Sequence, residues 1–300
     1  MNNFKCFFLL FVLSAILLTS CSTAVNHSTE PTYPTKESLS SEIPEKQPVS
    51  FLLESTEMEM PFGKTKSEFT YDQSGRLTKT VASTNDKVYM SEELFYDDNG
   101  YVIKKKQTSL DASGKESSVT TESFIFSEKG LIQSSTIITD TITTFTSYEY
   151  DAKNRLVLYT RKDALDNIIE KEQYEYLDDF GSYRLTSLDN QVTQLILDAT
   201  GNELERTLFN TDGSIVFSIK NEYDSKNNVV KSTDKDRVIT EFTNVYEGDL
   251  LISVEKYVDS ELAGKTVNEY DEYGNLCTKK ETNAAGTVVS STVNVWLPVY

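Results

Sequence analysis

Hydrophobic and polar residues alternate in short runs from residue 51 to the end of the chain, and turn-forming residues separate the runs. Residues 238–242 (Val-Ile-Thr-Glu-Phe) show this alternation. A period of two is typical of a strand with one buried face, whereas no stretch longer than ten residues has helical periodicity. The pattern therefore predicts an all-β domain over residues 51–300.

A turn motif recurs along this domain. It consists of an aromatic residue, a Gly or Asn four places later and an aliphatic residue six places later, as in Tyr-Asp-Gln-Ser-Gly-Arg-Leu over residues 71–77. The spacing between copies averages about 25 residues, which indicates a repeat architecture. Six copies fit the motif and three are looser, and they begin at Tyr71, Tyr96, Phe126, Tyr150, Tyr176, Leu197, Tyr223, Tyr246 and Tyr270.

The residue types of the motif predict a β-hairpin. Asp or Ser after the aromatic residue can accept a hydrogen bond from the backbone two residues on. Gly or Asn can adopt the left-handed conformation that closes a short loop. The aromatic and aliphatic residues then pack as a cross-strand pair. A second turn signal in each unit, such as residues 112–114, leaves two strands per repeat and predicts an antiparallel meander of about 18 strands.

Such a long sheet is expected to curve or to spiral. An apolar stripe at alternate positions, as at Phe69 and Tyr71, needs cover, which curvature supplies. We expect the stripe to weaken toward the C-terminus, where Asn221, Asn244 and Asn268 replace its apolar members. An outer-membrane barrel is disfavoured because strands such as residues 104–107 (Lys-Lys-Lys-Gln) are too polar to face lipid. Pro298 suits a terminal edge strand.

The first residues predict export. An apolar run over residues 7–18 follows Lys5, and Leu18-Thr19-Ser20-Cys21 comes directly after it. A short apolar run with a basic start and small residues before a cleavage point is typical of a secretory signal peptide, here residues 1–20. The four residues resemble the lipobox of bacterial lipoproteins. This resemblance implies lipidation of Cys21, cleavage after Ser20 and an extracytoplasmic protein anchored by lipid to the bacterial cell envelope.

Residues 22–50 predict a disordered tether. They contain four of the six prolines and many Ser and Thr, with almost no aromatic residues. Such a segment cannot bury enough apolar surface to offset the entropy of ordering it. The predicted organisation is therefore a signal peptide over 1–20, the lipidated cysteine and tether over 21–50, and the repeat domain over 51–300.

Composition removes several functional classes. The net charge of -18 disfavours nucleic-acid binding, which requires a basic surface. The single histidine, His27, lies in the tether, so no histidine-based metal or catalytic site is expected in the domain. Cys277 is expected to be a small buried apolar residue, and no nucleotide-binding glycine pattern or nucleophile elbow occurs. We predict no cofactor, no metal and no catalytic residues, and leave weak calcium binding at turn carboxylates open.

The motif Tyr-Asp-x-x-Gly-Arg-Leu, intact over residues 71–77, resembles the YD repeat of Rhs and teneurin-type proteins. The resemblance implies a spiralling β-sheet that wraps a cargo domain or presents a surface. About nine repeats are too few for a closed cocoon, so cargo encapsulation is not expected. Envelope lipoproteins of unknown function built from such repeats are a closer likeness, and they carry no activity to transfer.

Tyrosines outside the first motif position are the candidate binding residues, because tyrosine combines apolar area with a polar tip. These are Tyr101, Tyr159, Tyr257 and Tyr273. The sequence thus predicts a non-enzymatic envelope lipoprotein whose repeat domain presents a protein-binding or scaffold surface, with the membrane as a partner through Cys21. A glycan-binding surface protein is the alternative, and a glycosidase that uses carboxylates alone is a further one. Envelope protein or polysaccharide is the expected partner.

Overall fold

The computed structural model describes residues 48 and 50–299, so the predicted signal peptide, Cys21 and nearly all of the tether lie outside the described residues. The described chain is all-β, as predicted, and contains twenty strands. No helix in it is long and apolar enough to cross a membrane. The strands are β1 (Ser50–Met60), β2 (Gly63–Tyr71), β3 (Leu77–Thr84), β4 (Lys87–Tyr96), β5 (Val102–Leu110), β6 (Glu116–Phe126), β7 (Ile132–Thr139), β8 (Ile142–Tyr150), β9 (Leu156–Asp163), β10 (Ile168–Tyr176), β11 (Tyr183–Ser187), β12 (Val192–Leu197), β13 (Glu203–Phe209), β14 (Ile215–Tyr223), β15 (Val229–Asp234), β16 (Ile239–Glu247), β17 (Leu250–Val258), β18 (Glu261–Tyr270), β19 (Leu276–Asn283) and β20 (Val288–Val299).

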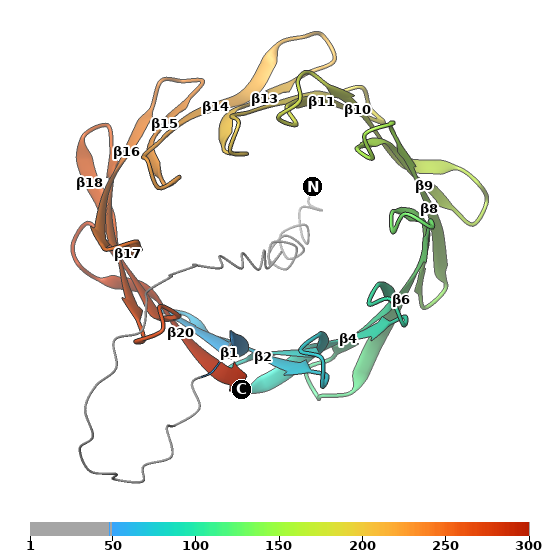
Figure 1. Cartoon of the computed structure of the whole chain (residues 1–300), viewed down its shortest axis with the longest axis horizontal. Coiled ribbons are helices and arrows are strands. Elements are labelled where there is room, and N and C mark those ends of the chain that lie inside the picture. Colours follow the sequence, from blue (N-terminus) through green and yellow to red (C-terminus); the bar gives the residue numbers. More distant parts are fainter. Residues whose placement is uncertain (1–47, 49, 300) are drawn as a thin grey trace, which may run out of the picture. The chain divides into compact units, whose positions relative to one another are not determined.

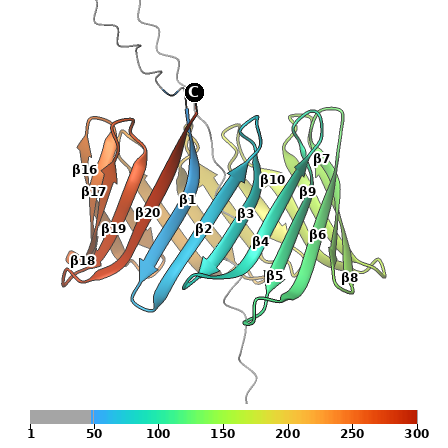
Figure 2. The ribbon, with the colours of Figure 1, turned by 90° about the horizontal axis from the view of Figure 1, so that it is seen from below.

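Each strand pairs antiparallel with the next one in the chain, and β20 also pairs with β1. The sheet therefore closes into a ring of tilted strands (Figures 1 and 2). The expectation of a curved or spiralling sheet is corrected, because the meander continues until its two ends meet. Twenty strands at ordinary spacing and tilt give a ring about 40 Å across.

The nine predicted motifs form nine hairpins, from β2–β3 to β18–β19, and so account for 18 strands. The remaining two strands make a tenth motif that is split between the chain ends. Leu53 lies opposite Trp296, in the same register as Leu77 opposite Tyr71. A register shift of one residue adjoins both pairs. Pro298 is therefore not on an edge strand, because β20 has β19 on one side and β1 on the other.

The predicted turn chemistry is confirmed and is used at both rims of the ring. In the first motif the Asp72 carboxylate accepts hydrogen bonds from the N–H groups of Ser74 and Arg76, and Gly75 has a φ of 76°. Asp111, in the turn between β5 and β6, accepts the corresponding pair from the backbone two and four residues on. The Arg76 N–H and side chain lower the pKa of Asp72, and the Ser113 hydroxyl, followed by the two backbone N–H groups, lowers the pKa of Asp111, because these bonds favour the charged carboxylate.

In seven of the ten motifs, the aromatic residue donates a hydrogen bond to a backbone carbonyl of the repeat before it. The Tyr96 hydroxyl donates to the Leu77 carbonyl at 2.6 Å, and Trp296 Nε1 donates to the Leu276 carbonyl at 3.0 Å. The pairing of β3 with β4 begins at Lys79, so the Leu77 carbonyl lies beyond the paired part of that junction. The tyrosine hydroxyl satisfies this carbonyl. The same bond joins Tyr71 to Leu53, Tyr150 to Ile132, Tyr176 to Leu156, Tyr223 to Glu203 and Tyr270 to Leu251.

Asparagine two residues before the aromatic residue reinforces this connection. Asn221 Nδ2 donates to the Glu203 carbonyl at 3.0 Å, the same acceptor that Tyr223 uses. Asn268 shares the Leu251 carbonyl with Tyr270 in the same way. The prediction that these asparagines mark a weaker junction was incomplete, because each one replaces apolar contact with a hydrogen bond to the neighbouring repeat.

The arginine of the motif has two contacts that explain its position. Arg155 Nε lies 2.8 Å from Asp151 Oδ2, within its own turn. Its guanidinium also lies 4.0 Å from the ring centre of Tyr176, in the next repeat. Arg76 repeats both contacts with Asp72 and Tyr96. The side chain thus holds its own turn and covers the aromatic residue of its neighbour.

The wall of the ring is one sheet thick. Among the described residues, Ala82 is the only buried hydrophobic residue, at 1% exposure, and the largest fully buried side chains are serines. The domain is therefore held by backbone pairing and by contacts between repeats rather than by a central apolar core.

The motif aromatic residues face the interior of the ring. Phe69 and Tyr71 are half-buried whereas Glu68 is exposed, and side chains crowd on the concave face of a curved sheet. The backbone agrees with this assignment. The Asn85 N–H donates to the Lys64 carbonyl, so even-numbered residues of β2 bond to β3. With β1, β2 and β3 in the order that Figure 2 shows, the handedness of L-residues turns Tyr71 inward.

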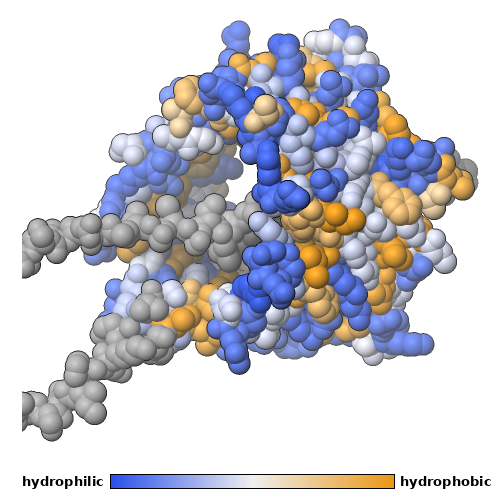
Figure 3. Space-filling model, turned by 45° about the vertical axis from the view of Figure 1, so that its right-hand side comes forward, coloured by the Kyte–Doolittle hydropathy of each residue, from blue (hydrophilic) through white to orange (hydrophobic). Residues whose placement is uncertain are grey.

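The outer wall carries charged residues beside exposed apolar ones such as Phe95, Ile125 and Val295. Ion pairs connect neighbouring strands on the face opposite the motif aromatic residues, as in Lys220–Glu205 at 3.2 Å and Lys265–Glu255 at 3.1 Å. Figure 3 shows hydrophilic and hydrophobic residues interspersed over the wall.

Candidate functional site

The inner wall has its highest density of tyrosines on β8 to β11. Four of them define what we call the tyrosine wall: Tyr148, Tyr159, Tyr174 and Tyr183, one on each of four successive strands. Register places them on one face, because Tyr148 lies opposite Tyr159, and Glu172, two residues from Tyr174, also lies opposite Tyr159. The motif residues Tyr150 and Tyr176 flank this set on the same face.

The rings of the tyrosine wall contact one another in pairs. Tyr148 and Tyr159 meet edge to face with ring centres 5.5 Å apart. Tyr174 and Tyr183 meet in the same manner at 5.4 Å. Edge-to-face contacts of this kind hold aromatic side chains in place while leaving part of each ring accessible. All four residues are half-buried.

Two glutamates and an arginine lie between the two tyrosine pairs. The Tyr159 hydroxyl donates to Glu170 Oε2 at 3.1 Å, and the Tyr174 hydroxyl donates to Glu172 Oε2 at 2.6 Å. Arg161 Nη2 lies 2.7 Å from Glu170 Oε2, and Arg161 Nε is buried with no hydrogen-bond partner among the described residues. The site therefore contains carboxylate acceptors and one unused guanidinium donor beside the aromatic rings.

Burial and the adjacent carboxylates keep the phenols protonated. Burial raises the pKa of Tyr159 to about 12, and the charge of Glu170 adds to the effect. Burial and then the hydrogen bond to Glu172 raise the pKa of Tyr174. Burial also raises the pKa of Tyr148 and of Tyr183. The four hydroxyls are thus hydrogen-bond donors at neutral pH.

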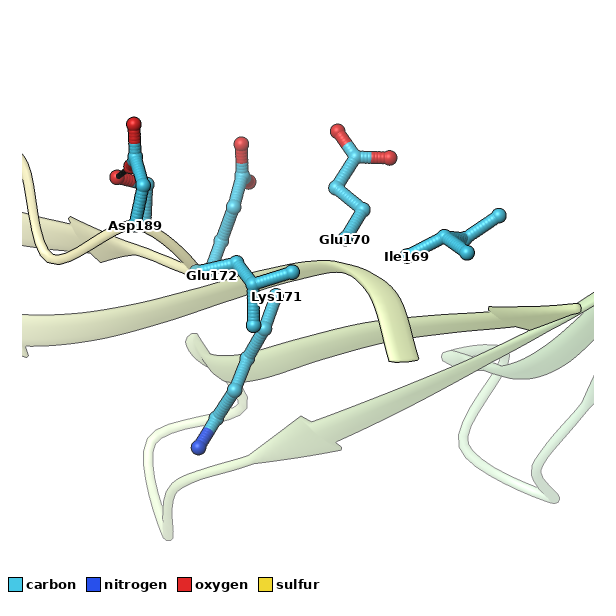
Figure 4. A pocket seen from close by; sticks show the side chains of 7 residues that line it. Ile169, Glu170, Lys171, Glu172 and Asp189 are labelled. Carbon is cyan, nitrogen blue, oxygen red and sulfur yellow. Dashed lines mark hydrogen bonds between the residues drawn. The ribbon is translucent and has the colours of Figure 1, made fainter. Parts of the chain in front are cut away.

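A shallow depression of about 350 Å³ adjoins the tyrosine wall. In Figure 4, Glu170, Glu172 and Asp189 project to one side of the sheet while Lys171 projects to the other. The lining residues are Ile169, Glu170, Lys171 and Glu172 of β10 and Ser187, Leu188 and Asp189 at the turn after β11. Because Glu170 and Glu172 share the face of Tyr159, the depression opens toward the interior of the ring.

The four tyrosines that the sequence indicated are not brought together. Only Tyr159 lies on the tyrosine wall. Tyr101 stacks on the Phe126 ring of the next repeat at 4.9 Å, and Tyr273 lies against Phe51 with ring centres 4.8 Å apart. Tyr257 is on β17, on the outer face, where its hydroxyl donates to Glu255. Their role in ligand binding stays a prediction.

Sequence reasoning missed Tyr148, Tyr174 and Tyr183. Tyr148 and Tyr174 each stand two residues before a motif aromatic residue, a position that was attributed to the core of the sheet. A ring with no central core leaves that position open to the interior. The signal was present in the sequence, since six tyrosines occur between residues 148 and 183.

Other kinds of site lack support in the described part of the chain. Among residues 48 and 50–299, no group of three or more His, Cys, Asp or Glu side chains is placed to hold a metal ion. Cys277 is half-buried, and its thiol lies 3.6 Å from the Asn275 carbonyl. Cys21 lies outside the described residues.

Comparison with known proteins identifies no family. No family model matches the chain, and no curated protein matches it. Among solved structures, the chain is similar to one titled the TcdB2–TccC3–Cdc42 complex, with 13% identity and a TM-score of 0.42. The match covers 76% of this chain and 15% of that chain, so this chain spans a small part of the toxin-complex polypeptide.

Two porin-like proteins are also similar in arrangement. The one from Bacteroides uniformis has 12% identity and a TM-score of 0.38, over 82% of this chain and 96% of that chain. The one from Bacteroides vulgatus has 8% identity and a TM-score of 0.25, over 82% and 99% of the two chains. These likenesses are too distant to carry a function.

Proposed function

We propose that this protein is a cell-envelope lipoprotein whose ring domain is a non-enzymatic binding or scaffold module. The observation that carries the proposal is the ring itself, whose inner wall concentrates half-buried tyrosines on one arc. The repeat motif, which resembles that of YD-repeat proteins, builds an extended rigid surface of this kind. The lipobox-like residues before Cys21 support attachment to a membrane through lipid.

The ion pairs of the outer wall support a ring that stands outside the bilayer. The ion pairs Lys220–Glu205 and Lys265–Glu255 lie within strands, where a spanning barrel would meet the hydrocarbon region. The net charge of -18 would also hold the ring away from anionic headgroups. Residues 22–50 are long enough to supply that separation, at about 30 Å for a flexible coil.

The carboxyl groups of the ring support a binding role over hydrolysis. A glycosidase that uses two carboxylates needs one of them as a general acid with a raised pKa. Among the described carboxyl groups whose pKa departs from its ordinary value, every shift is downward. Asp189, beside the depression, is one of them, lowered by the Ser187 hydroxyl. None of these shifts is in the direction that a general acid needs, which favours a binding role.

Two experiments test the proposal. The Cys21→Ala variant should accumulate as an uncleaved or unlipidated precursor with altered mass and detergent partitioning, and unchanged mass and partitioning would contradict the anchor. The immobilised mature chain should retain material from isolated envelope that has been split into protein and polysaccharide fractions. Retention of either fraction supports a binding or scaffold module. A ring that retains neither would end the proposal.

A further inference from the structure

The tyrosine wall combines features that point to one kind of ligand. Two edge-to-face tyrosine pairs lie on either side of Glu170, Glu172 and Arg161. We propose that the tyrosine wall is a binding site for a linear, uncharged glycan, an inference that rests on the proposed binding function and names its ligand class.

The aromatic part of the site fits the apolar faces of sugar rings. Tyr148 and Tyr183 are on strands three positions apart, so the wall spans about 14 Å across the sheet. That span accommodates several sugar units in line rather than a single one. Because each ring is held by an aromatic partner or by a hydrogen bond to glutamate, the platform is ordered before the ligand arrives.

The polar part of the site fits hydroxyl groups. Glu170 and Glu172 each use one oxygen for a tyrosine hydroxyl, which leaves further acceptor sites for sugar hydroxyls. The Arg161 side chain is 35% exposed, and its guanidinium has N–H donors beyond the one that meets Glu170, which can bond to a ligand oxygen. The Asp189 carboxylate and the Ser187 hydroxyl extend the polar set into the adjoining depression.

Charge and topology disfavour other polymers. Glu170, Glu172 and Asp189 outnumber Arg161, so an acidic polysaccharide or a nucleic acid would be repelled. An extended peptide commonly binds by adding a strand to a free sheet edge. Closure of β20 on β1 pairs both sides of each described strand and leaves no such edge.

The decisive experiment is isothermal titration calorimetry on the full mature chain in detergent. The probes are cellohexaose, chitohexaose, maltohexaose and xylohexaose, with a hexamer of galacturonic acid as the acidic comparison. We expect at least one neutral probe to bind and the acidic one not to bind. Tyr159→Ala and Tyr174→Ala should each weaken that binding at least tenfold. Glu172→Gln, which keeps the side-chain size, should weaken it severalfold and covers the case in which an alanine variant does not fold.

Tyr257→Ala is the matched control. Tyr257 donates to Glu255 two residues away, as Tyr174 donates to Glu172, but it lies on the outer face. Because Tyr257 lies on the outer face, its removal should leave sugar binding at the tyrosine wall unchanged, although its sequence position made it a candidate binding residue. Equal losses for Tyr257→Ala and Tyr174→Ala would overturn the assignment of the site, and so would binding of the acidic hexamer alone.

The glycan inference and the proposed function can fail separately. If no neutral probe binds but the envelope experiment captures one protein at stoichiometric yield, the ring is a protein scaffold and the glycan inference is wrong. If no probe binds and neither envelope fraction is retained, both are wrong.

Discussion

Trp296 lies directly opposite Leu53, and its indole Nε1 donates to the Leu276 carbonyl of the preceding repeat. Tyr223 has the same place in a motif that is continuous in sequence, with its hydroxyl on the Glu203 carbonyl. The junction between the chain ends therefore has the bonding of an internal repeat. The asparagine that donates to the same carbonyl is also present in both motifs. Asn294 donates to the Leu276 carbonyl as Asn221 donates to the Glu203 carbonyl.

This equivalence predicts the effect of removing one donor at the junction. Trp296→Phe should lower the free energy of unfolding by about 1 kcal/mol, because one hydrogen bond is lost while the asparagine still satisfies the carbonyl. Tyr223→Phe is the matched change inside the ring and should cost a similar amount. Urea unfolding followed by circular dichroism measures both. A cost at Trp296 several times larger than at Tyr223 would show that the junction is not an ordinary repeat contact.

The contacts of the motif arginine predict its contribution to stability. Arg155→Met removes the ion pair with Asp151 and the cation–π contact with Tyr176 but keeps an unbranched side chain. Both partners are partly exposed, so we expect a loss of about 1 to 2 kcal/mol in the free energy of unfolding. Arg184→Met is the control, since Arg184 is exposed and its Nε donates to Gln194 on the neighbouring strand β12. Equal effects of the two changes would contradict the role of the motif arginine.

Alanine substitutions at two glycines in equivalent turns measure the contribution of one contact between repeats, the contact of Gly130 with Tyr101. Gly130 and Gly114 have φ values of 76° and 82°, so alanine is strained at either site, by about 1 kcal/mol. A Cβ on Gly130 would lie 2.3 Å from the Tyr101 hydroxyl, whereas one on Gly114 would meet open space. Gly130→Ala should therefore destabilise the domain more than Gly114→Ala. Adding Tyr101→Ala should remove the excess, and melting temperatures that do not separate the two alanine variants would contradict the contact.

The lowered pKa of Asp224 predicts that the folded domain loses stability in acid. Burial opposes its ionisation, but hydrogen bonds from the Tyr246 hydroxyl, the Asn228 N–H and Asn244 outweigh burial and lower its pKa to about 2. The pKa of an unfolded aspartate is about 3.9. The charged group therefore stabilises the fold fully above about pH 4, and this contribution disappears as the pH falls through about 2.

The measurement compares Asp224→Asn with the unchanged chain across that pH range. At pH 7 the variant should be less stable by on the order of 1 to 2 kcal/mol, because a charged acceptor is stronger than a neutral amide. The difference should shrink between pH 4 and pH 2, as the unchanged chain takes up its proton. A constant difference from pH 7 to pH 2 would mean that Asp224 does not titrate in this way.

The hairpins could be predicted from the sequence because their determinants are local. Asp72, Gly75 and Leu77 lie within a few residues of Tyr71, so turn chemistry and cross-strand pairing are visible in one short window. Ring closure depends instead on Leu53 and Trp296, which are separated by almost the whole domain. Neither half of that motif fits the pattern alone, and so the chain was expected to end in an edge strand.

The candidate site was predicted only in part for a related reason. Tyr159 stood out because it lies off the motif, but its partner Tyr148 coincides with a position that packs in an ordinary two-layer fold. Whether that position is covered depends on the number of layers, which alternation along a strand does not reveal. The ring leaves it uncovered, and Tyr148, Tyr159, Tyr174 and Tyr183 become one surface.

Because the split motif pairs like a continuous one, the ring does not require the chain ends to lie at this junction rather than at another. If Val299 and Ser50 were joined by a short turn of the Asp-x-x-Gly type, the junction would become a tenth continuous hairpin. Seven of the nine continuous motifs have the same aromatic–aliphatic pair, so a break in any of their loops would create ends that meet as Trp296 and Leu53 do. These motifs and the split one thus form a cyclic permutation series, in which the native order of the chain is one of eight equivalent ways to cut the same circle.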